Sequence, residues 1–210
     1  MREEFLGDSY DLVKRFWASS LKGIAPLWAH PHFVPSELRP NFKKATTIPV
    51  LALEPPISKS GVVARGATMV FPAEDFGLLL DPDSGIPLAV DHPTNRVHCS
   101  VNFIEQLFEA HPNLTYVVCF DQSHDRSRPE LKGLRQLEEK RKMLTAAGLF
   151  SFYYKSHARF FFVARDEARL AKIRQRLVTA GIPDRRFKPP YEPGELEGGA
   201  MEEASGAPRT

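Results

Sequence analysis

The stretch Leu78-Leu79-Leu80-Asp81-Pro82-Asp83-Ser84-Gly85 decides how the chain is expected to fold. Three apolar residues in succession are typical of a strand that is covered on both faces. Pro82 cannot donate to a strand ladder and Gly85 permits a left-handed turn, so the strand ends here. Ligands of open parallel sheets bind just beyond the carboxyl ends of strands, which makes Asp81 and Asp83 candidate functional residues. An ordinary turn built from Asp, Pro, Ser and Gly is the alternative interpretation.

A second buried strand is expected at residues 114–120, one helix further along the chain. Its sequence, Leu-Thr-Tyr-Val-Val-Cys-Phe, is β-branched and aromatic, and the helix before it, residues 100–110, begins at the capping residue Ser100. Two strands joined through a helix run parallel, so the loops after them share one edge of the sheet. We therefore expect the following residues to be neighbours in space: Asp81, Asp83, Asp121, His124 and Arg126.

The remaining chain is expected to add helices at residues 8–22, 130–147 and 166–180, and an antiparallel hairpin from residues 150–154 and 159–164. In the first helix, Leu12, Val13, Phe16, Trp17 and Leu21 would face the core, while Asp11 and Lys14 would lie on a solvated face. In the basic helix 130–147, Leu131, Leu134, Leu137 and Leu144 would face inward and Lys140 outward. The pattern predicts an α/β fold with a mostly parallel sheet and a C-terminal antiparallel hairpin.

The segment from residue 24 to residue 60 is rich in proline, which argues against long helices and allows short strands at 27–29 and 48–53. His30 and His32 are two residues apart, so on a strand they would share a face. This spacing would suit half of a metal site, and the alternative is that both histidines have packing or surface roles.

Composition sets the outer bounds of the interpretation. The chain of 210 residues suits one α/β domain, residues 1–188, followed by an acidic, glycine-rich tail, residues 189–210, that is predicted to be disordered. A net charge of +2 does not by itself imply nucleic acid, although residues 126–188 are rich in Lys and Arg. Two cysteines argue against a disulfide scaffold and favour a cytoplasmic location. No run is long enough to span a membrane, and the N-terminus lacks a hydrophobic signal segment.

The order of elements from residue 77 to residue 180 resembles the second half of the Rossmann-like S-adenosylmethionine methyltransferases. In that family the fourth strand ends in an Asp/Asn-Pro-Pro-Tyr-type motif and the last two strands form a hairpin. Leu80-Asp81-Pro82-Asp83 is similar but lacks the second proline and the aromatic residue, and the chain has no Gly-x-Gly-x-Gly turn. The resemblance implies a three-layer Rossmann-like architecture, with S-adenosylmethionine as the cofactor.

The chain also resembles a loosely defined group of uncharacterised bacterial proteins that share three short motifs. Here these are Gly7-Asp8 with Asp11 and Lys14, then Leu80 to Gly85, and finally Gln122 with His124 and Arg126. The resemblance implies that these residues form a site, without naming a reaction.

Three functions remain open. In a methyltransferase-like enzyme, or a degenerate relative, acting on nucleic acid, Asp81, Asp83 and His124 would be catalytic, and Lys14, Gln122 and Arg126 would bind substrate or phosphate. In a Mg²⁺-dependent nuclease or phosphodiesterase, Asp81, Asp83 and Asp121 would hold the metal ion and His124 would act as acid or base. In a non-catalytic binding module, the same loops would recognise a partner.

Overall fold

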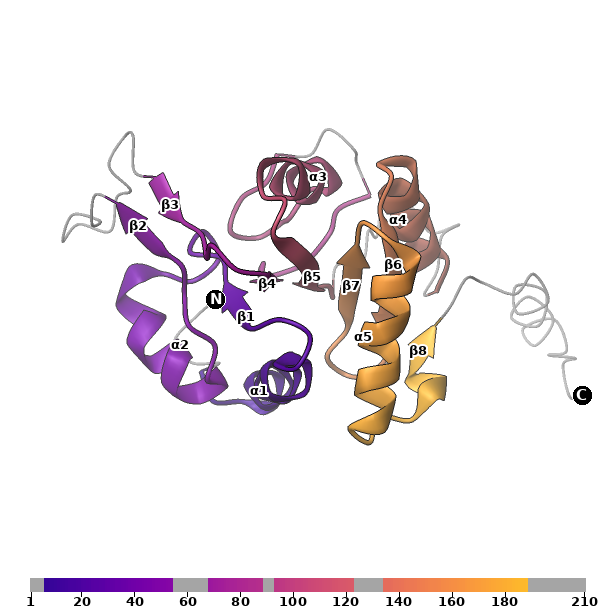
Figure 1. Ribbon diagram of the computed structural model, residues 1–210, viewed down its shortest axis with the longest axis horizontal. Coiled ribbons are helices and arrows are strands. Elements are labelled where there is room, and N and C mark those ends of the chain that lie inside the picture. Colours follow the sequence, from indigo (N-terminus) through magenta and orange to yellow (C-terminus); the bar gives the residue numbers. More distant parts are fainter. Residues whose placement is uncertain (1–5, 55–67, 89–92, 123–133, 189–210) are drawn as a thin grey trace, which may run out of the picture.

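The computed structural model describes residues 6–54, 68–88, 93–122 and 134–188, and it contains a six-stranded sheet flanked by helices (Figure 1). The strand order is β1-β4-β5-β7-β6-β8. The strands are β1 (Leu27–Ala29), β4 (Phe76–Leu80), β5 (Leu114–Phe120), β6 (Phe150–Tyr154), β7 (Phe160–Ala164) and β8 (Phe187–Lys188).

The sheet is mixed, because one half is parallel and the other antiparallel. Strand β4 pairs parallel with β1 and with β5, and Leu80 lies opposite Cys119. Strand β7 lies between β5 and β6 and is antiparallel to both, and β8 is antiparallel to β6. The expectation of a mostly parallel sheet was therefore wrong in its proportions. The insertion of β7 between β5 and β6 replaces one parallel pairing with two antiparallel ones.

The order in which strands are added to the sheet reverses at β1. Residues 49–51 extend the sheet beyond β1, since Val50 forms a parallel bridge with Ala29, whereas β4 pairs with the other side of β1. Nearby, β2 (Ala52–Glu54) and β3 (Thr68–Val70) form a small antiparallel sheet. In α/β sheets such a reversal point is where ligands commonly bind, at the carboxyl ends of the strands.

A short helix that the sequence analysis did not assign lies in the proline-rich segment, between the two stretches expected to be strands. The 3₁₀ turn η2 (Ser36–Leu38) leads directly into α2 (Arg39–Thr46). Pro40 occupies the first turn of α2, where a backbone N–H has no intrahelical partner. Proline is compatible with a helix start at this position, so a short helix forms in a segment whose prolines argue only against long ones.

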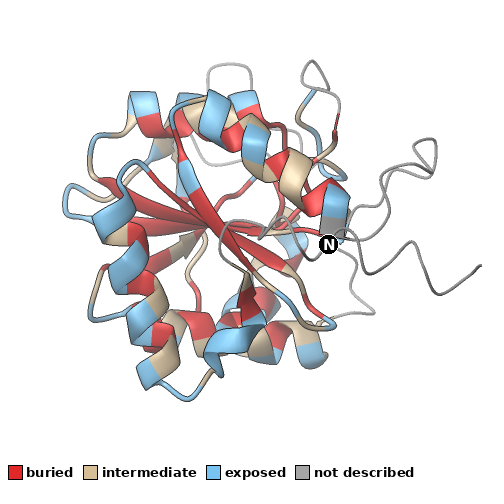
Figure 2. Cartoon of the chain, turned by 90° about the vertical axis from the view of Figure 1, so that its right-hand side faces the viewer, coloured by how far each residue is buried: buried red, intermediate tan, exposed pale blue. Residues whose placement is uncertain are grey.

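Helices cover both faces of the sheet, and each face has its own core (Figure 2). Helices α1 (Ser9–Leu21), α2 and α5 (Glu167–Thr179) pack on one face, which we call the α1 face. Helices α3 (Val101–Ala110) and α4 (Leu134–Ala146) pack on the other, the α3 face. Successive strand residues alternate between them, so Leu79 and Val118 face α1 while Leu80 and Cys119 face α3.

The helix starts agree with the capping residues read from the sequence. Asp8 caps α1, Ser100 caps α3 and Asp166 caps α5, each by accepting hydrogen bonds from backbone N–H groups of the first turn. None of the helices among the described residues has the length and apolar character that crossing a membrane requires.

Four side chains were assigned to the wrong environment. Asp11 and Lys14 of α1 are only 1% and 5% exposed, whereas Leu12 of the expected apolar stripe is 61% exposed. Lys140 of α4, expected in solvent, is 1% exposed. Leu137 and Leu144 of α4 are buried as predicted. Because each of the three buried charged groups has a charged partner, described below, tertiary pairing overrides the helical hydrophobic pattern.

The close packing of β4 against β5 depends on a glycine. The Tyr116 ring lies so close to Gly77 that a Cβ atom at position 77 would overlap it. The Tyr116 hydroxyl donates a 2.9 Å hydrogen bond to the carbonyl of Ala25, just before β1. This side chain therefore fixes the three parallel strands relative to one another.

Candidate functional site at the carboxyl edge of the sheet

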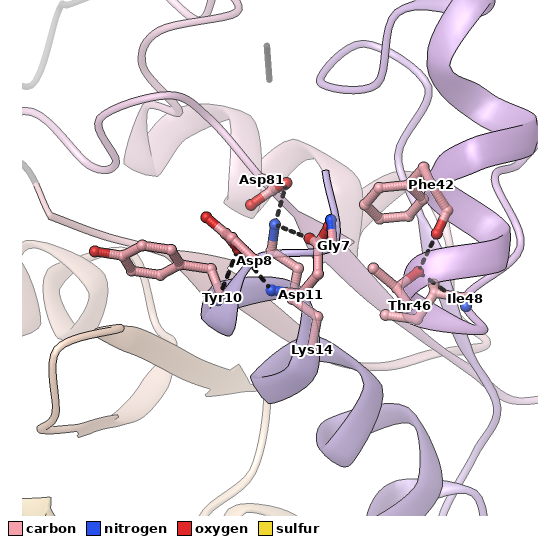
Figure 3. A network of polar contacts seen from close by, with 9 residues as sticks. All are labelled: Gly7, Asp8, Tyr10, Asp11, Lys14, Phe42, Thr46, Ile48 and Asp81. Atoms are coloured by element: carbon pink, nitrogen blue, oxygen red, sulfur yellow. Dashed lines mark hydrogen bonds and ion pairs between the residues drawn. The ribbon is translucent and has the colours of Figure 1, made fainter. Parts of the chain in front are cut away.

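The N-terminus of α1 lies at the carboxyl edge of the parallel strands, where its polar groups are tightly ordered (Figure 3). The Asp8 carboxylate accepts hydrogen bonds from the N–H groups of Tyr10 and Asp11. The Asp11 carboxylate accepts a 2.7 Å hydrogen bond from the Gly7 N–H through Oδ2. The Gly-Asp-x-x-Asp pattern thus has a local role in shaping the start of α1.

Lys14 connects this helix to the end of β4. Its Nζ lies 2.7 Å from Asp81 Oδ2 and 3.1 Å from Asp11 Oδ1. Burial alone would lower the pKa of Lys14, but Asp81 and then Asp11 outweigh it, so the pKa is raised above its usual value. The ammonium is therefore charged and is held between two buried carboxylates.

The group around Lys14 carries an excess of negative charge. Two carboxylates, those of Asp11 and Asp81, bind one ammonium, and a third, that of Asp8, caps the start of the same helix. Asp81 Oδ1 accepts no hydrogen bond from any residue in the described ranges, since only Oδ2 is paired with Lys14. This half of the edge is therefore suited to a positively charged or hydrogen-bond-donating ligand.

Asp121, at the end of β5, is bound to α4. Lys140 Nζ lies 2.9 Å from Asp121 Oδ1 and 2.8 Å from Oδ2, and both side chains are almost fully buried. The Ile86 N–H also donates to Asp121 Oδ1 at 2.9 Å. Gly85 has a φ of +129°, and a Cβ there would overlap the Asp121 carboxylate. The requirement for glycine at this turn is thus structural on two counts.

Asp81 and Asp121 lie at neighbouring strand ends but bind helices on opposite faces of the sheet. Strands β4 and β5 pair parallel, as expected, but the register that places Leu80 opposite Cys119 sets Asp121 one residue beyond the level of Asp81. Asp81 therefore bonds to α1 and Asp121 to α4. The two carboxylates do not form the shared cluster that was expected.

The geometry also fails to support the expected magnesium site. Within the described ranges, which include Asp81, Asp83 and Asp121, no group of three or more His, Cys, Asp or Glu side chains is placed to hold a metal ion. Asp83 is exposed, and its N–H donates to the carbonyl of Arg96. The prediction that His30 and His32 supply half of a metal site gains no further ligand from the described residues.

Gln122 lies at the same edge and connects α1 to the loop between β6 and β7. Its side-chain nitrogen donates to the Tyr10 hydroxyl at 3.0 Å and to the carbonyl of His157. The rings of Tyr10 and His157 are 5.5 Å apart between centroids. The structure therefore brings together three predicted site residues, Lys14, Asp81 and Gln122, through contacts that share α1.

Basic side chains occupy the other half of this edge. The loop between β6 and β7 contains Lys155 and His157, and η3 (Asp184–Arg186) contains Arg185 and Arg186; all four are exposed. The two segments are adjacent, because the Lys155 N–H donates to the Arg186 carbonyl at 2.7 Å. The carboxyl edge is thus divided into an acidic half beside β4 and a basic half beside β6 and β8.

Sequence reasoning missed Tyr10, Lys140 and the contribution of η3 to this basic half. Tyr10 lies one helical turn before Lys14, a spacing that places both on the same side of α1. His124 and Arg126, two further predicted site residues, lie outside the described residues, as does the tail from residue 189.

Fold and site together define an α/β protein with a polar, charge-divided site at the carboxyl edge of its parallel strands. Comparison with protein-family models, with curated protein sequences and with solved structures finds no match to this chain.

Proposed function

We propose that the protein is a methyltransferase-like enzyme of Rossmann-like architecture that acts on nucleic acid. The observation that carries the proposal is the division of one sheet edge into an acidic half at Asp81 and a basic half at Lys155 and Arg186. A reaction between a cationic cofactor and a polyanionic substrate needs both kinds of surface side by side.

The acidic half suits S-adenosylmethionine, which carries a sulfonium and an ammonium group. Asp81 has one carboxylate oxygen without a hydrogen bond from the described residues, and it ends β4 beside the point where the strand order reverses. Asp81-Pro82 also stands where the resemblance to this enzyme family has its Asp/Asn-Pro motif. Asp81 would therefore bind a donor group of the cofactor or substrate, and Lys14 would hold Asp81 in position.

The sheet arrangement gives further support. Strand β7 lies antiparallel beside β6, as the resemblance implies for the last two strands of these enzymes. The turn after β1 is Ala29-His30-Pro31-His32 rather than a glycine-rich loop, so the chain holds the cofactor, in this proposal, through side chains rather than by close backbone approach.

The basic half suits the phosphate backbone of a nucleic acid. Lys155, His157, Arg185 and Arg186 are exposed and belong to adjacent segments. Phosphate contacts of this kind give affinity without sequence preference and weaken steeply with salt.

A non-catalytic binding module is a second candidate, favoured by one observation. The three short motifs contact one another: Lys14 pairs with Asp81, the backbone N–H of Gln122 donates to the Ser84 carbonyl, and the Gln122 side chain donates to Tyr10. A structural role explains these contacts without catalysis. The nuclease is not favoured, because Asp81 and Asp121 are bound to lysines on opposite faces of the sheet.

The test is calorimetric binding of S-adenosylmethionine to the full chain, followed by transfer of a labelled methyl group to single-stranded RNA and DNA. Asp81→Asn removes the charge and keeps the shape, and we expect cofactor binding to weaken by about tenfold or more. Asp166→Asn is the matched control, because Asn also caps helices and Asp166 caps α5 away from this site.

Absence of both cofactor binding and methyl transfer would refute the enzyme and leave the binding module. Mg²⁺-dependent cleavage of the nucleic acid would instead favour the nuclease. Retained nucleic-acid binding, weakened by raised salt and by Lys155→Glu, would support the binding module.

A further inference from the structure

His30 lies at the end of β1, buried on the α3 face. Its N–H donates to the carbonyl of Leu79 at 3.0 Å, which makes it the last residue of the ladder between β1 and β4. The imidazole is 3% exposed and packs against two aromatic rings, with centroid distances of 5.7 Å to Phe33 and 5.3 Å to Phe103. A polar ring is thus enclosed by apolar ones.

The hydrogen bonds of His30 determine where its proton lies. The His32 N–H donates to His30 Nδ1 at 3.2 Å, so Nδ1 is an acceptor and Nε2 carries the hydrogen. Burial, with smaller effects of His32 and His111, lowers the pKa of His30 to about 3, so the ring is neutral. Nε2–H is buried and has no acceptor among the described residues. A buried donor without a partner costs about 1–3 kcal/mol.

A second unpaired donor lies beside it. Trp28 is two residues before His30 on β1, packs on the same α3 face, and its indole Nε1–H is also buried without an acceptor among the described residues. Residues two apart on a strand are separated by about 7 Å, and their side chains point to the same face. Two N–H donors therefore lie in a row beside the reversal point of the strand order.

This pair favours an acceptor ligand over a metal ion. If Nε2 coordinated a metal ion, it would lose its proton, and the neutral ring would then carry its proton on Nδ1. Nδ1 could then no longer accept the hydrogen bond from the His32 N–H. An acceptor atom leaves that hydrogen bond intact. The surrounding rings of His32, Phe33 and Phe103 add flat surfaces on which a heteroaromatic ligand would stack.

We propose that Trp28 and His30 form a binding site for a purine base, whose ring nitrogens or carbonyl oxygen accept hydrogen bonds from the two N–H groups. The inference goes beyond the proposed function, because the site would bind a purine nucleoside whether or not the protein transfers methyl groups. The adenine of S-adenosylmethionine is one such base. The rings next to His30 include Phe103, which is partly buried, and His32, which is exposed, and rotation of either side chain would open a path to Nε2.

The experiment follows the histidine side-chain ¹H–¹⁵N resonances of the full chain during titration with adenosine, guanosine and ribose 5-phosphate. We expect the His30 Nε2 resonance to shift saturably with a purine nucleoside and to remain unchanged with ribose 5-phosphate. His30→Phe fills the same volume without the donor. It should weaken nucleoside binding about tenfold. Because it also removes the Nδ1 acceptor of the His32 N–H, the melting temperature is measured alongside to show that the variant is folded.

Trp17→Phe is the matched control, because the Trp17 indole N–H is also buried without an acceptor among the described residues but lies on the α1 face, and this variant should bind the nucleoside normally. No shift with either nucleoside, or equal binding by His30→Phe, would overturn the inference. The resonance readout uses the unsubstituted protein, so a folding defect of a variant cannot obscure it. Nucleoside binding that depends on His30, with neither S-adenosylmethionine binding nor methyl transfer, would support this site and refute the proposed enzyme.

Discussion

Replacement of Lys140 by Met tests whether Asp121 is a structural residue. Lys140 and Asp121 form an ion pair with both side chains at 1% exposure or less, and Asp121 Oδ1 also accepts from the Ile86 N–H. Methionine preserves most of the volume of the lysine stem but removes the ammonium, so the Asp121 carboxylate loses this cationic partner while it stays buried.

The expected cost follows from the burial of the pair. Removal of one member of a buried ion pair typically destabilises a protein by about 3–5 kcal/mol. For a chain of this size each kcal/mol lowers the melting temperature by about 2–4 °C, so Lys140→Met should lower it by about 6–20 °C. Urea unfolding, followed by the fluorescence of Trp17 and Trp28, measures the change in the free energy of unfolding.

The double variant Asp121→Leu with Lys140→Met provides the decisive comparison. Because both charges are removed together, its cost should be far smaller than the sum of the two single-variant costs. Additive costs, or a cost below about 1 kcal/mol for Lys140→Met, would refute the claim that this pair holds the Asp83–Ile86 turn on β5. Lys142→Met is the control, since Lys142 pairs with Glu139 on the exposed side of α4 and should change stability by less than about 1 kcal/mol.

Two further predictions concern the other pair and the sheet. The pKa of Lys14 is raised above 10.5, so its contribution to stability is complete below pH 10.5 and is lost as the pH rises through the folded-state pKa. The free energies of unfolding of the unsubstituted chain and of Lys14→Met, measured between about pH 9 and about pH 11, should therefore differ less at alkaline pH. A difference that stays constant with pH would contradict this. Gly77→Ala would force a methyl group into the Tyr116 ring, so thermal unfolding should show a loss of at least about 1–3 kcal/mol in the free energy of unfolding. Gly148→Ala is the control, because no atom lies within 4 Å of its new Cβ. With φ at +73°, this variant should lose only the smaller free energy that an alanine costs in that backbone conformation.

The strands were predictable because their signals are local. Residues 114–120 and 150–154 were assigned correctly from β-branched and aromatic runs. The parallel pairing of β4 and β5 followed from the single helix between them. The position of β7 between β5 and β6 was not predictable in this way, because the order of strands in a sheet depends on contacts between segments that are distant in sequence.

The candidate site was predictable in location but not in its contacts. The sequence indicates that Asp81 and Asp121 follow neighbouring strands, yet the face to which each carboxylate points depends on the register of Leu80 with Cys119. Likewise Lys14 and Lys140 look like solvated helix residues, because a helical pattern records charge but not the buried partner. Tertiary ion pairs override the pattern at both positions.

The position of β7 has a consequence for the order in which the chain can assemble during its synthesis. On the side of β5 that faces away from β4, the backbone N–H and C=O groups pair with β7, residues 160–164. This edge of β5 therefore stays unpaired until the ribosome has released that segment. A chain truncated before residue 160 would expose a continuous apolar edge, Val117 to Phe120, that can template pairing with a second chain. Fragments ending in the β6–β7 loop should therefore aggregate, whereas those extending through Ala164 should close the sheet.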